Sequence, residues 1–165
     1  MLTKKQIKLL ELLEDQMSDC KDCNLWTGGY FSPYWTPKSK IIIIDSYPNF
    51  TSKAEFKKIF QTTYYHGYDK EQFAIISCTN CYDDEKLRSY ESLEECDQWV
   101  RKFIRIIEPT NILLLGKTAI EKFFPGEGYQ KKIIEIIYYN LKIKMYLCLI
   151  INHLNIFYKM LKENK

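Results

Sequence analysis

The sequence has few of the residues on which the common catalytic motifs depend. It contains only two histidines and six glycines among 165 residues. It has no HExxH zinc motif, no glycine-rich phosphate-binding loop and no readable serine–histidine–aspartate spacing. These absences remove the usual signatures of metalloproteases, nucleotide-binding proteins and serine hydrolases, so a catalytic site would need a different set of residues.

The sequence also lacks an unbroken apolar run long enough to cross a membrane. Residues 1–17 are amphipathic and have no apolar core of the kind found in signal peptides. The most apolar stretch, residues 133–151, is interrupted by charges that include Glu135 and Lys142. We therefore expect an intracellular protein of the cytoplasm or nucleoid, with no membrane association. Six cysteines in a reducing compartment favour metal or cluster binding over disulfides.

What the sequence does contain is enough apolar material for one packed core. Hydrophobic residues make up 46% of the chain and aromatic residues 15%, which predicts a single domain over residues 1–165. The net charge is +3, and the chain is distinctly basic outside an acidic segment at residues 83–97. A basic surface suits phosphate contacts with DNA, although solvated surface lysines would give the same composition.

Hydrophobic periodicity predicts an alternation of strands and helices. Short apolar runs predict strands at residues 41–44, 73–77, 111–115, 133–139 and 143–151, the last two as a hairpin. Helical spacing predicts helices over residues 2–17, 54–60, 92–107 and 118–124, and from residue 155. Ser52 and Ser92 are the expected N-caps of the second and third helices. This order indicates an α/β fold with a mostly parallel sheet, whose ligands bind beyond the carboxyl ends of the strands.

The cysteines have the spacing of metal ligands. Cys20 and Cys23 form a C-x2-C pair, and Cys81 and Cys96 follow on either side of acidic residues. Four thiolates in this pattern can hold an iron–sulfur cluster. Cys78 forms a second C-x2-C pair with Cys81, so a zinc site of Cys20, Cys23, Cys78 and Cys81 is an alternative.

Several segments match one family pattern in order along the chain. The pattern C-x2-C-x-L begins at Cys20, and an apolar strand at residues 40–44 is followed by Pro48. Residues 108–119, EPTNILLLGKTA, combine a proline, an apolar strand and a Leu-Gly pair. His153 begins a His-Leu-Asn sequence after the last predicted strand. Together these segments resemble the iron–sulfur uracil-DNA glycosylases of families 4 and 5.

The resemblance implies a fold, a cofactor and a reaction. The fold would be a three-layer α/β/α sandwich around a mostly parallel four-stranded sheet. The cofactor would be a structural [4Fe–4S] cluster on Cys20, Cys23, Cys81 and Cys96. The reaction would be hydrolysis of the N-glycosidic bond of uracil, or of a related base, after the base is flipped out of DNA.

The resemblance also implies which residues would hold the flipped base. Phe50 takes the position of the aromatic residue that stacks on the base, and Tyr47, three residues earlier, is a further candidate for binding the base. Ser77 or Asn80 would read the edge of the base. For Phe50, a place in the hydrophobic core is the more common role.

Three further residues would carry the chemistry. His153 would stabilise the anion that leaves with the base, while Asp45 or Ser46 would position water or stabilise the cationic sugar. A turn or helix-cap carboxylate is the alternative role for Asp45. The DNA-binding residues would be Lys117, Asn155, Phe157 and Lys159. Phe157 or Tyr158 would wedge into the duplex, and the apolar face of the last helix is their alternative place.

The catalytic motifs depart from the family pattern more than the cysteines do. Ser46 stands where the family has an acid, and Leu154 and Asn155 replace the proline and serine that follow the histidine. These changes favour a second hypothesis, in which a catalytically degraded member binds DNA or serves as a scaffold for other replication or repair proteins. A third hypothesis is a zinc-stabilised module unrelated to glycosylases.

Overall fold

A computed structural model describes most of the chain. It covers residues 1–46, 61, 64, 67–81, 90–125, 133–138 and 141–148, the last two ranges as backbone. The helices predicted at residues 54–60 and from residue 155 lie outside the described residues. Among the described helices, none is both long and apolar enough to cross a membrane.

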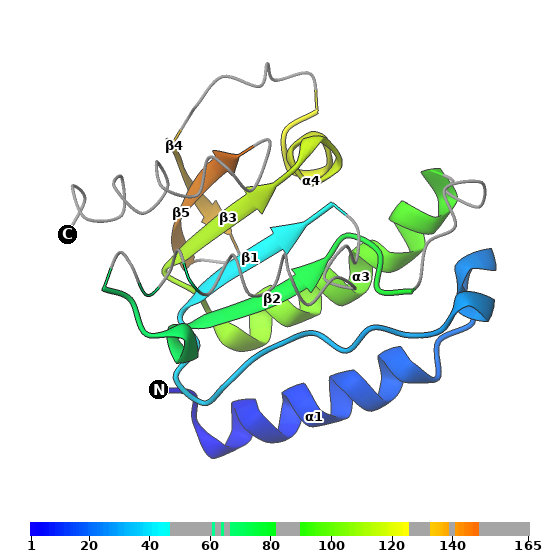
Figure 1. The fold of residues 1–165 in the computed structure, drawn as a ribbon, viewed down its shortest axis with the longest axis horizontal. Helices are drawn as coiled ribbons and strands as arrows, with labels where there is room; N and C mark the ends of the chain where they lie inside the picture. The colour runs from blue at the N-terminus through cyan, green and yellow to red at the C-terminus, as the bar shows by residue number, and fades with distance from the viewer. Residues whose placement is uncertain are drawn as a thin grey trace.

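The centre of the fold is a mostly parallel β-sheet (Figure 1). Its strands are β1 (Ile41–Asp45), β2 (Phe73–Ser77), β3 (Asn111–Leu115), β4 (Ile133–Tyr138) and β5 (Leu141–Cys148). They are arranged in the order β2-β1-β3-β5-β4. β1 pairs in parallel with β2 and β3, and Ile43 lies opposite both Ile75 and Leu113. The predicted α/β class and parallel sheet are therefore confirmed.

The described sheet has five strands, the number of apolar runs in the sequence, whereas the resemblance implies four. β5 pairs in parallel with β3, and β4 then pairs with β5 in the antiparallel direction. The two strands form the hairpin that the sequence predicts near residue 140. An antiparallel edge strand needs only a short hairpin connection, whereas another parallel strand would need a crossover.

Three helices are described beside the sheet. They are α1 (Lys4–Ser18), α3 (Tyr90–Ile107) and α4 (Lys117–Phe123). α1 begins at a capping box, in which the main-chain N–H of Gln6 donates to Thr3 Oγ1 and the main-chain N–H of Thr3 donates to Gln6 Oε1. The expectation that Ser92 caps the third helix is wrong, because α3 already includes Tyr90. Ser92 instead donates a side-chain hydrogen bond to Asn24 Oδ1 at 3.1 Å.

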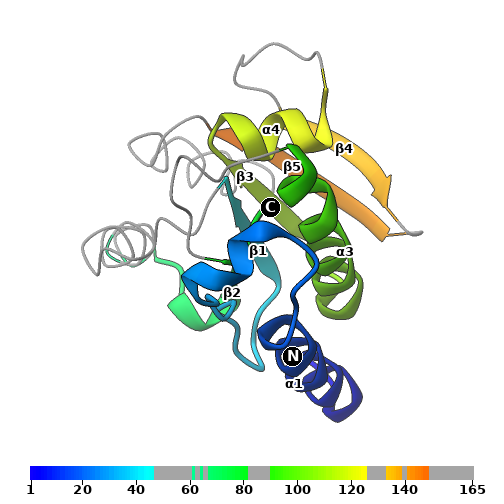
Figure 2. The same cartoon turned by 90° about the vertical axis from the view of Figure 1, so that its right-hand side faces the viewer.

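The described helices pack on one face of the sheet (Figure 2). Leu10, Leu13 and Met17 recur at helical spacing on α1 and are buried against α3 and the strands. Alternate strand residues, including Ile42 and Ile44, belong to the same hydrophobic cluster. Every residue of β1 and β2 is buried, so the opposite face of these two strands is covered as well.

Candidate metal centre and the ends of the strands

The fold brings the four predicted ligand cysteines to one place. Cys20 follows the end of α1, and Cys23 precedes a short 3-10 helix at Asn24–Gly28. Cys81 lies four residues beyond the end of β2, and Cys96 lies within α3. All four line a single pocket between these elements. The pocket is small, with a volume of about 10 Å³, which is room for about one water molecule.

A strand-like segment holds the N-terminal cysteines beside Cys81. Tyr30 forms an antiparallel bridge with Cys81, and Tyr34 forms another with Ile75. The main-chain N–H of Phe31 also donates to the carbonyl of Asn80 at 2.8 Å. The segment after the first cysteine pair therefore runs along β2, which explains how residues so far apart in sequence share one pocket.

The pocket distinguishes Cys81 and Cys96 from Cys78. Cys78 is fully buried and does not line it. Its main-chain N–H donates to the carbonyl of Asp45 at 2.8 Å, which ties Cys78 to the end of β1. The arrangement thus favours the set Cys20, Cys23, Cys81 and Cys96 over the zinc set that includes Cys78.

The pocket offers four thiols as potential ligands. No three His, Cys, Asp or Glu side chains in the described part of the chain are grouped as ligands of one metal ion. Thiolates are the ligands of iron–sulfur clusters and of structural zinc. The four thiols therefore match either group in ligand type and number.

Burial favours the protonated form of three cysteines of the pocket. Burial, together with a smaller effect of neighbouring cysteines, raises the pKa of Cys96 to about 12 and that of Cys81 to about 11. Burial also raises the pKa of Cys20. Thiolates are the species that bind metal, so binding here would release protons.

Three N–H groups already point at sulfur atoms of the pocket. The main-chain N–H of Asp22 and the indole N–H of Trp99 donate to Cys20. The main-chain N–H of Asn80 donates to Cys96. Each hydrogen bond lowers the thiol pKa in opposition to burial, because it stabilises the thiolate. Protein sites commonly hold sulfur ligands in this way.

Asp45 and Ser77 meet at the carboxyl edge of the sheet, as the sequence predicts. They are directly opposite in the register of β1 and β2, and both are buried. Asp45 Oδ1 accepts a hydrogen bond from the main-chain N–H of Ser46 at 2.8 Å. The alternative role of Asp45 is that of a turn carboxylate, and a hydrogen bond to the next main-chain N–H is a contact of that kind.

Ser46 is held in a structural role. Its hydroxyl donates to the carbonyl of Leu115 at 3.1 Å and accepts from the main-chain N–H of Ala119 at 3.2 Å. Ala119 is in the first turn of α4, whose N-cap, Gly116, has no side chain to satisfy that N–H. Ser46 therefore caps a helix that begins about 70 residues later in the chain.

Asn80 lies between the strand ends and the cysteines. Its Oδ1 accepts from the main-chain N–H of Ser77 at 3.4 Å, and its side chain lines the cysteine pocket. Lys117, by contrast, is at the surface, with a side chain 67% exposed and an ion pair to Glu121 at 3.7 Å. The remaining predicted site residues lie outside the described residues: Tyr47, Phe50, His153, Asn155, Phe157 and Lys159.

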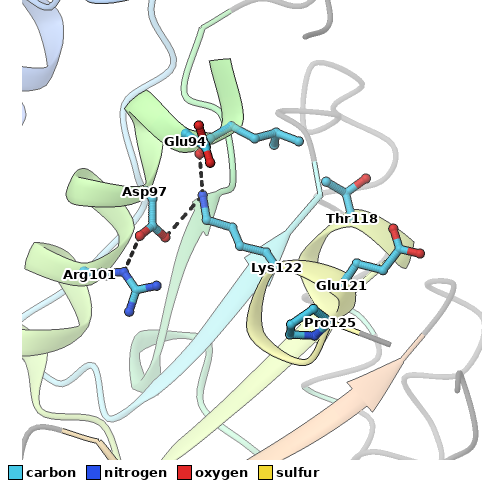
Figure 3. A pocket seen from close by; sticks show the side chains of 8 residues that line it. Glu94, Asp97, Arg101, Thr118, Glu121, Lys122 and Pro125 are labelled. Carbon is cyan, nitrogen blue, oxygen red and sulfur yellow. Dashed lines mark hydrogen bonds and ion pairs between the residues drawn. The ribbon is translucent and has the colours of Figure 1, made fainter. Parts of the chain in front are cut away.

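A larger pocket, with no cysteine among its described lining residues, lies between α3 and α4 (Figure 3). Its volume is about 640 Å³. Lys122 donates to the carbonyl of Leu93 at 2.8 Å and forms an ion pair with Asp97 at 3.4 Å, while Arg101 forms a second ion pair with Asp97. The sequence analysis missed this network, because charges on two separate amphipathic helices give no sign that they will meet.

The sequence matches no known protein-family model and no curated protein.

Proposed function

We propose that the chain is an iron–sulfur protein of the uracil-DNA glycosylase superfamily, and that it excises uracil or a related base from DNA. The observation that carries the proposal is the convergence of Cys20, Cys23, Cys81 and Cys96 on one pocket, to the exclusion of Cys78. The resemblance to the family selects the same four cysteines from their sequence context alone. A [4Fe–4S] cluster on these thiolates is the cofactor that both observations favour.

The proposed fold is the three-layer α/β/α sandwich of that family. Three helices on one face of a parallel sheet account for two of the layers. Burial of all the residues of β1 and β2 supports a layer on the other face too. When bound, the cluster would supply a cross-link between the end of α1, the end of β2 and α3.

In the proposed reaction, residues at the carboxyl edge of the sheet act on a flipped nucleotide. Phe50 stacks on the base, and His153 stabilises the negative charge that develops on it as the glycosidic bond breaks. Asp45 holds the attacking water or stabilises the cationic sugar. Ser46 is the weaker candidate for that task, because its only O–H donor is already used on the Leu115 carbonyl.

Lys117, at the start of α4, is proposed to contact DNA phosphates together with Asn155, Phe157 and Lys159. The supporting observation is that the Lys117 side chain is well exposed beside the carboxyl end of β3. Phosphate contacts of this type make affinity fall steeply as the salt concentration rises.

The environment of Ser46 favours a second candidate function. The position at which the family has a water-associated acid is here a helix cap buried against α4. A chain that kept its scaffold and lost this group would be a DNA-binding or scaffold subunit of a repair or replication complex, without glycosylase activity.

An oligonucleotide that contains one uracil separates the two functions. The glycosylase proposal expects an abasic product, with the rate strongly reduced by Asp45→Asn and by His153→Ala. Asp69→Asn is the matched control, because Asp69 is an exposed carboxylate near the start of β2, at the opposite edge of the sheet. Salt-sensitive DNA binding with no abasic product would support the scaffold and contradict the enzyme.

A further inference from the structure

Asn80 carries a buried amide group whose hydrogen-bonding capacity is only half used. The residue is 4% exposed and directly precedes Cys81. The main-chain N–H of Ser77 points at one atom of the amide, which must therefore be the oxygen, Oδ1. Nδ2 has no hydrogen-bond partner among the residues that the structure describes. A buried donor without a partner is uncommon and costly, and it calls for an explanation.

The surroundings of Asn80 indicate what the missing partner is. Its side chain lines the same pocket as the four cysteines. The main-chain N–H of Asn80 already donates to Cys96, and Trp99 and Asp22 donate to Cys20. The acceptors that these donors share are sulfur atoms, and thiolates accept more strongly than thiols.

We infer that Asn80 is a positioning residue of the metal centre, whose Nδ2 donates to a sulfur of the metal-bound thiolate group. The inference rests on the cluster in the proposed function, and it replaces the role of base reader that the sequence resemblance implies for Asn80. Ser77, at the edge of the sheet beside Asp45, keeps the base-reading role.

The donor has a defined physical effect. Hydrogen bonds to sulfur stabilise the more negative, reduced state of a cluster and strengthen its attachment. Removing Nδ2 therefore makes the reduction potential more negative and speeds the loss of the cluster to a chelator. Loss of a second-shell partner typically weakens metal binding by about 10- to 100-fold.

The test uses the full chain purified without oxygen. Asn80→Ala removes both the amide and its bulk, whereas Asn80→Asp keeps the shape but replaces the donor with an oxygen that can carry a negative charge. The effect of the donor itself is therefore the change that the two variants share. Thr79→Val is the matched control, because Thr79 is a neighbouring buried polar residue that does not line the pocket. Reduction potentials come from a mediated titration, and cluster loss is followed as bleaching during exposure to a chelator. Circular dichroism verifies that each variant is folded.

We expect both Asn80 variants to have a more negative potential and about 10-fold or faster bleaching, with Thr79→Val close to wild type. If the wild-type protein holds iron and the Asn80→Asp variant matches it in reduction potential and bleaching rate, the inference about Asn80 is wrong. The proposal of a cluster is then unaffected. If Asn80→Asp changes only the choice of excised base, Asn80 is a base reader and the inference is again wrong. A wild-type protein without iron overturns the inference and the proposed cluster together.

Discussion

The contact between Gly116 and Ser46 allows a quantitative test of how the sheet edge is built. Gly116 has φ +91°, and a Cβ added there would lie less than 3.0 Å from Ser46 Oγ. The substitution Gly116→Ala therefore has two costs. The backbone conformation costs an alanine about 1–3 kcal/mol. Displacing the Ser46 hydroxyl removes the cap of α4, which costs about 1 kcal/mol.

We expect Gly116→Ala to lower the free energy of unfolding by about 2–4 kcal/mol, the sum of these two costs. Gly67→Ala is the matched control, because Gly67 has φ +76° but nothing within 4 Å of an added Cβ. Its cost should be the backbone cost alone, about 1–3 kcal/mol. Ser46→Ala should cost about 1 kcal/mol, through loss of the cap.

Urea denaturation of the two single variants and the double variant completes the test. Because both single changes remove the same cap, the double variant should be about 1 kcal/mol more stable than the sum predicts. The proposed contact would be refuted if the free-energy costs of the two single variants were strictly additive. It would also be refuted if Gly116→Ala cost no more than Gly67→Ala. If Ser46→Ala abolishes base excision while the free energy of unfolding is unchanged, Ser46 is catalytic rather than structural.

Two other predictions follow from buried ionisable groups. Without metal, the contribution of Cys81 and Cys96 to the free energy of unfolding should be constant below about pH 9. It should fall as the pH rises toward about 12, because burial raises the folded-state pKa of both thiols above the usual value of 9.0. pH-dependent urea denaturation measures this fall, which should be smaller in Cys96→Ser, and a flat profile would contradict it. Lys122→Met should cost about 1–3 kcal/mol in the same assay, because the 11% exposed side chain bonds Leu93 and Asp97. Lys117→Met, at the exposed pair, should cost at most about 0.5 kcal/mol, and equal costs would contradict the structural role of Lys122.

The sequence was informative where local pattern decides the structure. β2 and β3 begin and end at the predicted residues, because continuous apolar runs such as 73–77 are typical of strands buried on both faces. The cysteine pattern likewise identified residues that share a pocket, because spacing and order along the chain limit which thiols can meet.

The sequence was less informative where distant segments decide the structure. The cap of α4 comes from Ser46, far away in the chain, so no local motif marks it. The start of α3 was misplaced because Ser92 looks like a cap, although its hydroxyl is used on Asn24 inside the fold. The place of Asn80 was ambiguous for a similar reason, because only the three-dimensional arrangement shows that it lines the cysteine pocket.

The metal content of the protein purified without oxygen tests the proposed cluster most directly. We expect a brown protein with broad absorption near about 400 nm and about four irons per chain. Cys96→Ser should lose both the colour and the iron, while Cys78→Ser should keep them, because Cys78 is buried yet does not line the pocket. A colourless protein with one zinc, or iron lost with Cys78→Ser and retained with Cys96→Ser, would contradict the cluster.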